Sequence, residues 1–365
     1  MSEQRRPIIV IAEAGVNHNG DLGLARELIS AAADAGADFV KFQTFVSTAS
    51  IRSDAPKAKY QETAISGDEG MLEMVKKLEL STEAFQELAV FARGQKIGFL
   101  STAFDLESLK VVKGLDPKFL KIPSGEITNA ALLLAASNSG LPLLISTGMA
   151  NKDDIQMALG VVAFGIMGRD INHASTEEFA RALSDPQSRK RLKEMVTLLH
   201  CTTEYPAPID EINLSAMTAM GDEFGLSVGY SDHSLGISVP IAAAALGATV
   251  LEKHITIDRN LKGPDHAASL EPDQMNAMVA AIRDVELALG SSEKGPTPSE
   301  LKNRDLVRKS LVALRAIDPG EILTSENVGL KRPAHGLPGM KYFDVLGSPA
   351  KRHYQPDEYI ELSTE

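Results

Sequence analysis

The sequence contains a single cysteine, Cys201, and no tryptophan among its 365 residues. One thiol excludes an intramolecular disulfide and is typical of a reducing compartment, whereas the lack of tryptophan excludes nothing. The N-terminus has no apolar stretch of the kind that signal peptides carry, and no apolar run reaches the length of a membrane span. We therefore expect a soluble cytoplasmic protein without a membrane partner.

Basic residues are fewer than acidic ones. Lys and Arg number 37 against 49 Asp and Glu, which gives a net charge of -12. No block of like charges is long enough to form a charged tail. This balance argues against binding of nucleic acid over a broad surface, although it leaves open a local basic pocket for one small anion.

Several common catalytic motifs are also missing. The chain has no Walker A loop, no Gly-x-Gly-x-x-Gly after a strand-like run, no His-Glu-x-x-His and no Gly-x-Ser-x-Gly. Nucleotide hydrolysis, a Rossmann cofactor, a zincin site and an α/β-hydrolase therefore lose support. Cys201 follows a strand-like run, and we interpret it as a buried structural thiol rather than a nucleophile.

The chain does have a regular alternation of short β-rich runs and longer helical patterns. A helical stretch over residues 22–35 separates the first two runs, which is the βαβ pattern of a parallel sheet. Eight such units before residue 290 predict an α/β fold of the TIM (β/α)8 barrel type, whose catalytic groups lie at the C-terminal ends of the strands. The expected strands are 8–12, 38–43, 97–101, 118–122, 142–146, 196–200, 226–230 and 248–252.

Two segments exceed what a minimal barrel needs. Residues 47–77 form a long connection after the second strand, and residues 161–194 are polar and helical before the sixth. Long loops on the C-terminal face of a barrel commonly cover ligands, but an ordinary surface elaboration explains such segments equally well. Both explanations remain open at this point.

The C-terminal part has a different composition. A last amphipathic helix over residues 273–289 is followed by residues rich in Gly, Ser and Pro. We therefore assign residues 1–290 to the barrel and residues 291–305 to a linker. Residues 306–365 contain short strand-like pieces between turn signals, which predicts a small β-rich module that is marginally stable alone.

Polar side chains follow nearly every predicted strand. Two lysines, several hydroxyls and Gly-bearing turns would meet at one barrel mouth, and together they predict a site for one phosphate and one carboxylate. The Ser and Thr residues could instead cap the helices that follow the strands. The candidates are Lys41, Thr102, Lys121, Ser124, Ser146 and Ser231.

Two glutamates are candidate acid/base groups. Glu13 and Glu126 each follow an apolar run, so partial desolvation could tune the pKa of either carboxyl. One of them could instead be a salt-bridge partner that orients a lysine. The residues alone do not choose between the two.

His233 and His254 are the candidate metal ligands. They are separated by 254 − 233 = 21 residues, a suitable length for one strand end, one helix and the next strand end. Two imidazoles at adjacent strand ends leave most coordination positions to water and substrate, as a Lewis acid requires. For His18, His200 and His266, ligand contact, support of another side chain and structural filling all remain open.

These strand ends resemble those of the sialic acid synthases, the N-acetylneuraminate synthases and their relatives for legionaminic and pseudaminic acids. The resemblance covers almost the whole chain, and the C-terminal module resembles the antifreeze-like SAF domain of that family. The motifs that carry it are Ala12-Glu-Ala-Gly-Val-Asn-His-Asn-Gly-Asp21, Phe39-Val-Lys-Phe-Gln-Thr44, Lys121-Ile-Pro-Ser-Gly-Glu126, Ser146-Thr-Gly-Met149, His200-Cys-Thr-Thr-Glu-Tyr-Pro206, Gly229-Tyr-Ser-Asp-His233, Glu252-Lys-His254 and Gly263-Pro-Asp-His266.

The resemblance implies a condensation of phosphoenolpyruvate with an open-chain N-acetylated aminohexose, which releases phosphate and forms a nine-carbon 2-keto acid. It implies a divalent metal on His233 and His254, manganese first, with magnesium or cobalt as alternatives. N-acetylmannosamine is the first expectation for the sugar, and its analogue 2,4-diacetamido-2,4,6-trideoxymannose, the acceptor of N,N'-diacetyllegionaminate synthases, is the alternative.

The resemblance also implies a role for each candidate site residue. The anion candidates above match family positions around phosphoenolpyruvate, together with Thr203, where relatives can have Asn. A second departure is Ala103, where Pro is frequent. The resemblance places Glu13 and Glu126 near the acid/base step, and it assigns to the sugar Gln43, Tyr205, Asp265 and Arg332.

Family members are commonly domain-swapped homodimers in which the SAF domain of one subunit caps the barrel of the other, and Arg332 matches the residue that reaches the sugar. Two other classes of function stay open. Lys41 or Lys121 could form a Schiff base in an aldolase, or the chain could be a non-catalytic sugar-binding or ice-binding protein.

Overall fold

The computed structural model describes residues 7–57 and 70–362. The chain divides into two compact units, Met1–Gly290 and Ser291–Glu365. None of the helices in these described ranges is long and apolar enough to cross a membrane.

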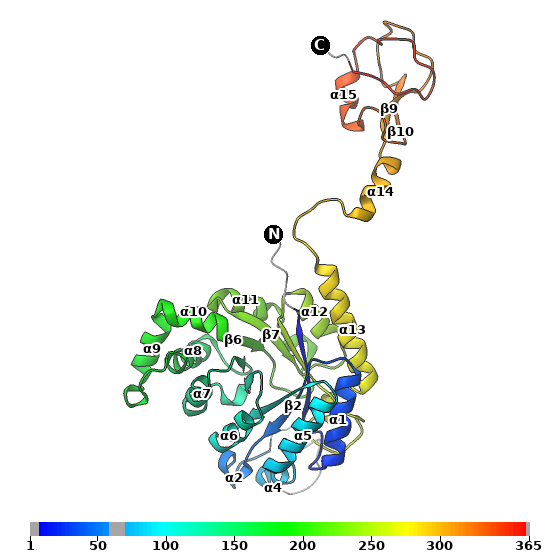
Figure 1. The fold of residues 1–365 in the computed structure, drawn as a ribbon. Coiled ribbons are helices and arrows are strands. Elements are labelled where there is room, and N and C mark those ends of the chain that lie inside the picture. The colour runs from blue at the N-terminus through cyan, green and yellow to red at the C-terminus, as the bar shows by residue number, and fades with distance from the viewer. Residues whose placement is uncertain (1–6, 58–69, 363–365) are drawn as a thin grey trace. The chain divides into compact units, whose positions relative to one another are not determined.

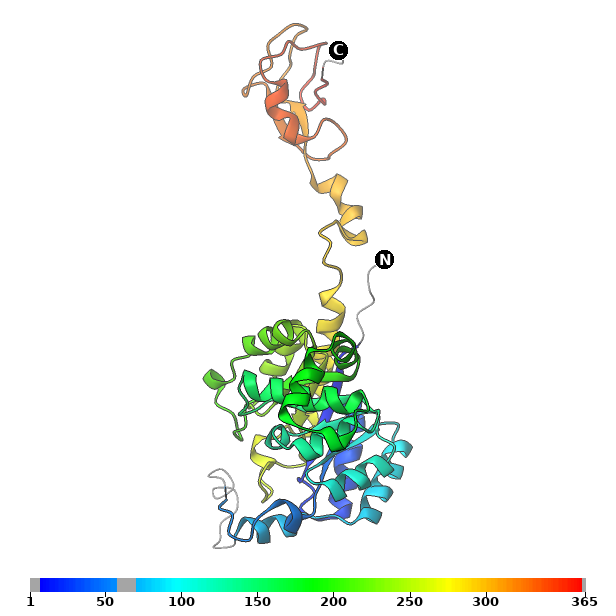
Figure 2. The same cartoon turned by 90° about the vertical axis from the view of Figure 1, so that its left-hand side faces the viewer.

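The first unit is a closed barrel of eight strands in the order β1 to β8, which confirms the predicted TIM barrel. Every neighbouring pair of strands is parallel. Helices surround the strands in both side views (Figures 1 and 2). The strands are β1 Ile9–Gly15, β2 Phe39–Thr44, β3 Gly98–Ala103, β4 Leu120–Ile122, β5 Leu143–Ser146, β6 Val196–His200, β7 Ser227–Asp232 and β8 Val250–His254.

The helices between these strands start where the sequence supplies a cap. Asp21 accepts a hydrogen bond from the Leu24 amide at the start of α1, and Asn151 forms a capping box with Asp154 at the start of α8. The helices of this unit are α1 Leu22–Asp34, α2 Ser47–Ser50, α4 Met71–Lys76, α5 Thr82–Gly94, α6 Leu106–Gly114, α7 Ala130–Ser137, α8 Lys152–Ile166, α9 Thr176–Ser184, α10 Pro186–Met195, α11 Ser215–Phe224, α12 Ser238–Ala245 and α13 Pro272–Leu289.

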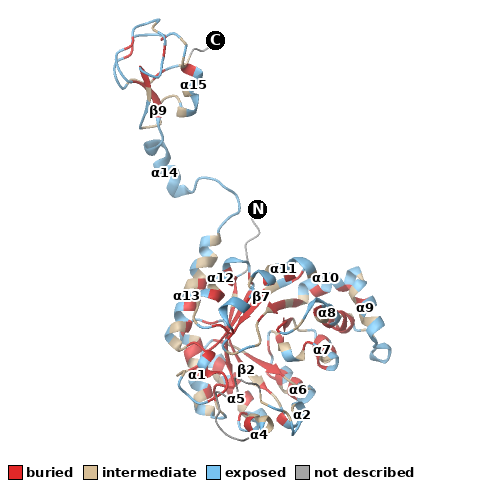
Figure 3. Ribbon diagram, turned by 180° about the vertical axis from the view of Figure 1, so that it is seen from behind, coloured by how far each residue is buried: buried red, intermediate tan, exposed pale blue. Residues whose placement is uncertain are grey.

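Apolar residues fill both sides of the barrel wall. One large cluster packs α1, α5, α12 and α13 against the strands, and another does so for α6, α7 and α8. Inside the barrel, a third cluster includes Ile11, Phe39, Leu100, Leu144, Leu199 and Val250. Figure 3 accordingly shows the strands as the most buried part of this unit. This cluster fills the centre of the barrel, so that a ligand site can form at its C-terminal mouth.

Five strands run further than the sequence pattern predicted. β1 continues to Gly15, β2 to Thr44, β3 to Ala103, β7 to Asp232 and β8 to His254. The reason is ladder pairing, since residues 9–13 of β1 pair in register with residues 250–254 of β8. Glu13 and His254 are therefore held within strands rather than in the loops that follow them.

The two segments that exceed a minimal barrel differ in where they lie in the structure. Residues 161–194 begin inside α8 and continue into α9 and α10, whose Ala182 and Leu192 join the outer core. This segment is a surface elaboration. The segment 47–77 contains α2 and α4 but also residues 58–69, which lie outside the described part. Its described residues reach the barrel mouth, as shown below.

The second unit begins with a difference from the sequence prediction. Residues 298–307 of the expected linker region form helix α14 (Pro298–Val307), which a capping box between Thr297 and Glu300 starts. Strands β9 (Ser310–Ala313) and β10 (Val328–Lys331) then pair antiparallel, and α15 (Tyr342–Val345) follows. Near the C-terminal end of the described part, Tyr359 forms an isolated bridge with Val312. A core around Leu311, Ala313 and Tyr354 holds this small β module together.

Candidate active site

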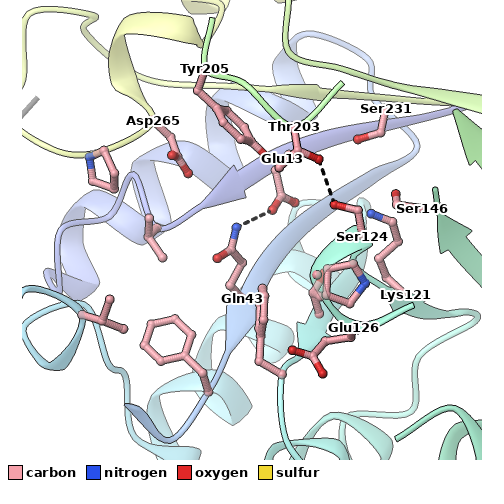
Figure 4. Close-up of a pocket in the computed structure, with 18 of the residues that line it drawn as sticks. Glu13, Gln43, Lys121, Ser124, Glu126, Ser146, Thr203, Tyr205, Ser231 and Asp265 are labelled. Carbon is pink, nitrogen blue, oxygen red and sulfur yellow. Dashed lines mark hydrogen bonds between the residues drawn. The ribbon is translucent and has the colours of Figure 1, made fainter. Parts of the chain in front are cut away.

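A cavity of about 380 Å³ lies at the C-terminal ends of the barrel strands. It brings together all the predicted site residues of the barrel unit, from all eight strand ends, as Figure 4 shows for ten of them. These residues are Glu13, Lys41, Gln43, Thr102, Lys121, Ser124, Glu126, Ser146, Thr203, Tyr205, Ser231, His233, His254 and Asp265. Arg332 belongs to the other unit, so its predicted role stays a prediction.

Lys41 is buried at the centre of a network of charges. Its Nζ lies 2.7 Å from Oε2 of Glu13 and 3.6 Å from Oε2 of Glu252, and it donates a hydrogen bond of 2.8 Å to the Thr102 hydroxyl. Burial alone would lower the pKa of Lys41, but the two carboxylates outweigh it and raise the pKa above its ordinary value. Lys41 is therefore an ammonium ion and not a free amine.

Glu252 joins the two lysines and was not singled out from the sequence. Its Oε1 accepts hydrogen bonds from Nζ of Lys121 at 3.0 Å and from the Ser231 hydroxyl at 2.8 Å. Burial would raise the pKa of Glu252, but the ammonium groups of Lys121 and Lys41 hold it well below its usual range. The signal that could have revealed Glu252 is its position two residues before His254, because residues i and i+2 of a strand share a face.

Glu13 differs from Glu252 in its protonation. Burial raises the pKa of Glu13 to about 7, against the opposing effect of the Lys41 ammonium. A group with this pKa can accept or donate a proton near neutral pH. Glu126, the other candidate, contacts no lysine in the described hydrogen bonds and accepts one from the Asn129 amide at 2.7 Å.

The two histidines face the cavity side by side, with ring centroids 5.6 Å apart. The Nδ1–H of His233 donates to the carbonyl oxygen of Thr202 at 2.6 Å, and the Tyr205 ring packs on the His233 ring at 4.1 Å. Nδ1 of His254 is buried, has no hydrogen-bond partner and lies 3.8 Å from Oδ2 of Asp265. Burial lowers the pKa of His233 to about 4 and that of His254 well below its ordinary value, so both rings are neutral.

This pair fits a metal ion by its chemistry. Since a carbonyl oxygen can only accept, His233 carries its proton on Nδ1 and keeps a lone pair on Nε2, the arrangement that orients metal-binding histidines. No group of three His, Cys, Asp or Glu side chains with metal-binding spacing occurs within residues 7–57 and 70–362, so the candidate ligands here are the pair His233 and His254.

The charge balance of the cavity also favours a bound metal ion. Among the described residues that line it, two lysines stand against the four carboxyl groups of Glu13, Glu126, Glu252 and Asp265. Burial also raises the pKa of Asp265 to about 6. The lining therefore has no surplus of positive charge for a multiply charged anion, and a divalent cation would supply it.

Gly148 shapes the hydroxyl side of the cavity. A Cβ at this position would lie 2.2 Å from Oγ1 of Thr203, whose hydroxyl is 3.2 Å from that of Ser124. For the substrates that the resemblance implies, we expect Gly148→Ala to displace Thr203 and to raise the KM for phosphoenolpyruvate severalfold while the KM for the sugar changes little. Steady-state kinetics with each substrate varied in turn would measure this. The matched control is Gly114→Ala, because Gly114 lies outside the cavity and its Cβ would meet open space.

The three ambiguous histidines do not line the cavity. His200 pairs with the carbonyl oxygen of Ile212 at 2.8 Å, His266 with the Thr256 hydroxyl at 2.7 Å, and His18 with the Gly20 amide at 3.0 Å. These contacts are those of structural side chains. Cys201 borders the cavity, but burial raises the pKa of its thiol, which argues against a nucleophilic thiolate.

Comparison with known proteins gives consistent matches for both units. The model of the NeuB family matches residues 28–294, and that of the SAF domain matches residues 308–363. The chain is 47% identical over 352 residues to the N,N'-diacetyllegionaminic acid synthase of Campylobacter jejuni, covering 96% of this chain and 98% of that one. It is 43% identical to the enzyme of the same name from Legionella pneumophila, with 93% and 89% covered.

A solved structure shares the fold. It is the N-acetylneuraminic acid (sialic acid) synthetase of Leptospira borgpetersenii in complex with citrate, at 32% identity and a TM-score of 0.65. The similarity covers 82% of this chain and 90% of that one.

Proposed function

We propose that this chain, which belongs to the NeuB family and ends in a SAF domain, condenses phosphoenolpyruvate with an N-acetylated aminohexose to form a nine-carbon 2-keto acid. The observation that carries the proposal is the single cavity in which two buried lysines, several hydroxyls, a glutamate of raised pKa and two neutral histidines meet. Phosphoenolpyruvate brings one phosphate and one carboxylate, and the lysines with the hydroxyls of Thr102, Ser124, Ser146, Thr203 and Ser231 are the donors for both.

In the proposed reaction, bonds form and break in a fixed sequence. C3 of phosphoenolpyruvate attacks the aldehyde carbon of the open sugar, and the aldehyde oxygen takes up a proton. Water then adds at C2 and loses a proton, which leaves a hydroxyl group there. The bond between C2 and the phosphate oxygen breaks, the C2 hydroxyl becomes the keto carbonyl, and its proton passes to the departing inorganic phosphate. Glu13 is placed to move one of these protons, because its carboxyl has a pKa of about 7 beside the Lys41 ammonium.

His233 and His254 are the residues that would hold the divalent metal, for which manganese is our first choice. When bound, such an ion would polarise the sugar aldehyde as a Lewis acid. Tyr205 packs against His233 and fixes its ring, while Gln43 donates to Glu13 at 3.2 Å and fixes that carboxyl.

For the sugar, we propose 2,4-diacetamido-2,4,6-trideoxymannose, so that the product is N,N'-diacetyllegionaminate. The support is that the relatives with 47% and 43% identity are both named for that product. N-acetylmannosamine, the first expectation from the sequence, becomes the second candidate and is favoured by the Leptospira synthetase at 32% identity.

A phosphate-release assay with the two sugars side by side tests this choice. We expect a kcat/KM at least about tenfold higher for the diacetamido sugar. The two sugars differ by an acetamido group at C4 and a hydroxyl at C6, and even one methylene group in an apolar pocket discriminates by about that factor or more. A preference for N-acetylmannosamine would reverse the choice of sugar. No phosphate release with either sugar would refute the proposed reaction.

The Schiff-base alternative makes a different prediction. Because Lys41 is paired with two carboxylates and its pKa is raised, we expect no covalent trapping when the protein is incubated with pyruvate and borohydride. Peptide mass spectrometry would detect a modified lysine. A pyruvyl adduct on Lys41 or Lys121 would contradict the proposed synthase.

We also propose a homodimer in which the C-terminal unit of one subunit covers the barrel mouth of the other. Exposed apolar side chains on the loops after several strands support this, as do Met340 and Phe343 of the C-terminal unit, which are 91% and 81% exposed. The loop residues are Val46, Leu106, Met149, Ile209, Leu235 and Leu261.

In such a dimer Arg332 would contact the sugar. We therefore expect Arg332→Ala to raise the KM for the sugar about tenfold or more and to leave the KM for phosphoenolpyruvate within twofold, because loss of one charged hydrogen bond costs about 1.5–3 kcal/mol. Steady-state kinetics would measure the two KM values, and light scattering would show whether the protein is a dimer. Equal changes in the two KM values would count against this role, and Arg308→Ala is the control, as an exposed arginine of the same unit.

A further inference from the structure

One side of the cavity consists of apolar side chains that the steps above do not use. They come from the end of β2, from α2 and from α4, and we call them the apolar wall: Phe45, Ile51, Met71, Met74, Val75 and Leu78. Met74 and Leu78 are only 3% and 9% exposed, and the Phe45 ring packs edge-on against Phe104 at 6.2 Å. The wall is therefore an ordered surface and not a chance exposure of apolar groups.

The cavity also has a polar part, in which the two lysines are already paired with carboxylates. Lys41 and Lys121 are the cations among the described lining residues, and both are bound to carboxylates. In Figure 4, Glu13 and Gln43 lie between Lys121 with Ser146 on one side and Asp265 on the other. A sugar whose aldehyde reaches Glu13 and the histidines must extend away from the lysines. A phosphorylated or hydroxyl-rich sugar end would lose hydration against the wall without gaining a partner.

We propose that the apolar wall is a subsite for the two methyl groups that N-acetylmannosamine lacks, that of the C4 acetamido substituent and that of the deoxygenated C6. This inference rests on the proposed function and specifies its substrate class as 6-deoxy sugars with more than one acetamido group. Each methyl group that meets the wall leaves water for an apolar contact, and such contacts discriminate between substrates by about 10- to 200-fold.

The test replaces part of a wall side chain by a hydroxyl: a methyl group in Val75→Thr and the ethyl group in Ile51→Thr. In Val75→Thr and in Ile51→Thr we expect the KM for the diacetamido sugar to rise about fivefold or more, since the added hydroxyl must be desolvated when a methyl group binds. The KM for N-acetylmannosamine should change less than twofold. Val90→Thr is the matched control, because Val90 lies outside the cavity on α5 and is 59% exposed.

The outcomes separate this proposal from the proposed function. If the KM values for the two sugars change by the same factor in both variants, or do not change, the subsite is refuted while the synthase remains. If the unmodified protein uses neither sugar, the proposed function itself fails.

A second inference comes from an ion pair behind the barrel wall. The side chains of Lys253 and Asp232 are both 0% exposed, and Lys253 Nζ lies 2.5 Å from Oδ2 of Asp232. The two residues face each other across β7 and β8. Lys253 also donates to the carbonyl oxygen of Ser234, and Oδ1 of Asp232 accepts from the Ser234 amide at 2.9 Å.

These contacts enclose the two candidate metal ligands. His233 lies between Asp232 and Ser234, and His254 follows Lys253. Because successive strand residues point to opposite faces, the ion pair lies behind the sheet while the imidazoles face the cavity. A buried ion pair is no more stabilising than well-packed apolar side chains, so fold stability alone does not explain it. We infer that Lys253 and Asp232 are positioning residues that fix the spacing of His233 and His254.

Replacement of the whole pair tests this inference. We expect the double variant Lys253→Met with Asp232→Leu to keep the melting temperature within a few degrees, and to bind Mn²⁺ about tenfold or more weakly by titration calorimetry, as loss of supporting contacts commonly does. A second double variant, Lys253→Met with Asp232→Asn, keeps an acceptor for the Ser234 amide and leaves no unpaired buried ammonium group. It should weaken Mn²⁺ binding less and serves if the first double variant does not fold. Unchanged Mn²⁺ affinity in either folded variant would refute the positioning role.

Discussion

Replacing His254 with alanine is expected to lower the rate of phosphate release about a thousandfold. A metal ion that polarises a carbonyl supplies several kcal/mol of transition-state stabilisation, and each 1.36 kcal/mol corresponds to about a factor of ten. The same loss should follow when an excess of chelator removes the metal from the unmodified protein. Single-turnover measurements with both substrates saturating would measure the chemical step directly.

The control is His173→Ala, because the His173 side chain is 77% exposed and lies outside the cavity. It should retain full activity and full sensitivity to the chelator. Full turnover in excess chelator, or a His254→Ala variant as active as the parent, would contradict a metal site at the two histidines.

Replacing Glu252 with glutamine is expected to have the largest effect on stability. Glu252 holds Lys121 and Lys41 in a site with almost no solvent access, so its loss leaves two buried ammonium groups with the single carboxyl of Glu13. Breaking a buried ion pair in this way costs about 3–5 kcal/mol. An anion that binds the lysines should then recover more stability in this variant than in the parent.

Urea unfolding with and without inorganic phosphate would measure both parts of this expectation. Glu107→Gln is the control, because Glu107 pairs with Lys110 on the surface, where such pairs contribute little. If Glu252→Gln unfolds at the same urea concentration as the parent, the buried ion pairs do not contribute the stability that we describe. If phosphate stabilises both proteins equally, the lysines are not the anion site.

The fold could be predicted because strands buried on both faces of a parallel barrel produce continuous apolar runs, and helices of 3.6-residue period separate them. The predicted ends of the strands were less accurate. β1 and β8 pair as far as Glu13 and His254, and this ladder depends on the neighbouring strand rather than on the local sequence. The helix α14 was mistaken for linker, because Pro298 favours the first turn of a helix as well as a turn.

Most of the cavity could be predicted for the same reason as the fold, since a barrel brings all the C-terminal strand ends together. Two features of the cavity could not be predicted from the sequence. Glu252, the last residue of its expected strand, received no role, because its contacts with Lys41 and Lys121 depend on the closure of the barrel rather than on the local sequence. The apolar wall comes from α2 and α4, whose approach to the mouth depends on tertiary packing that no local period reveals.

The central claim is that phosphate leaves by cleavage of the bond between carbon and oxygen after a new carbon–carbon bond has formed. The most direct test uses phosphoenolpyruvate labelled with ¹⁸O at the bridging oxygen, together with Mn²⁺ and the diacetamido sugar. We predict that the label appears in inorganic phosphate, with one phosphate for each nine-carbon 2-keto acid seen by mass spectrometry. Label retained in the organic product, or phosphate released without the keto acid, would contradict the proposed reaction.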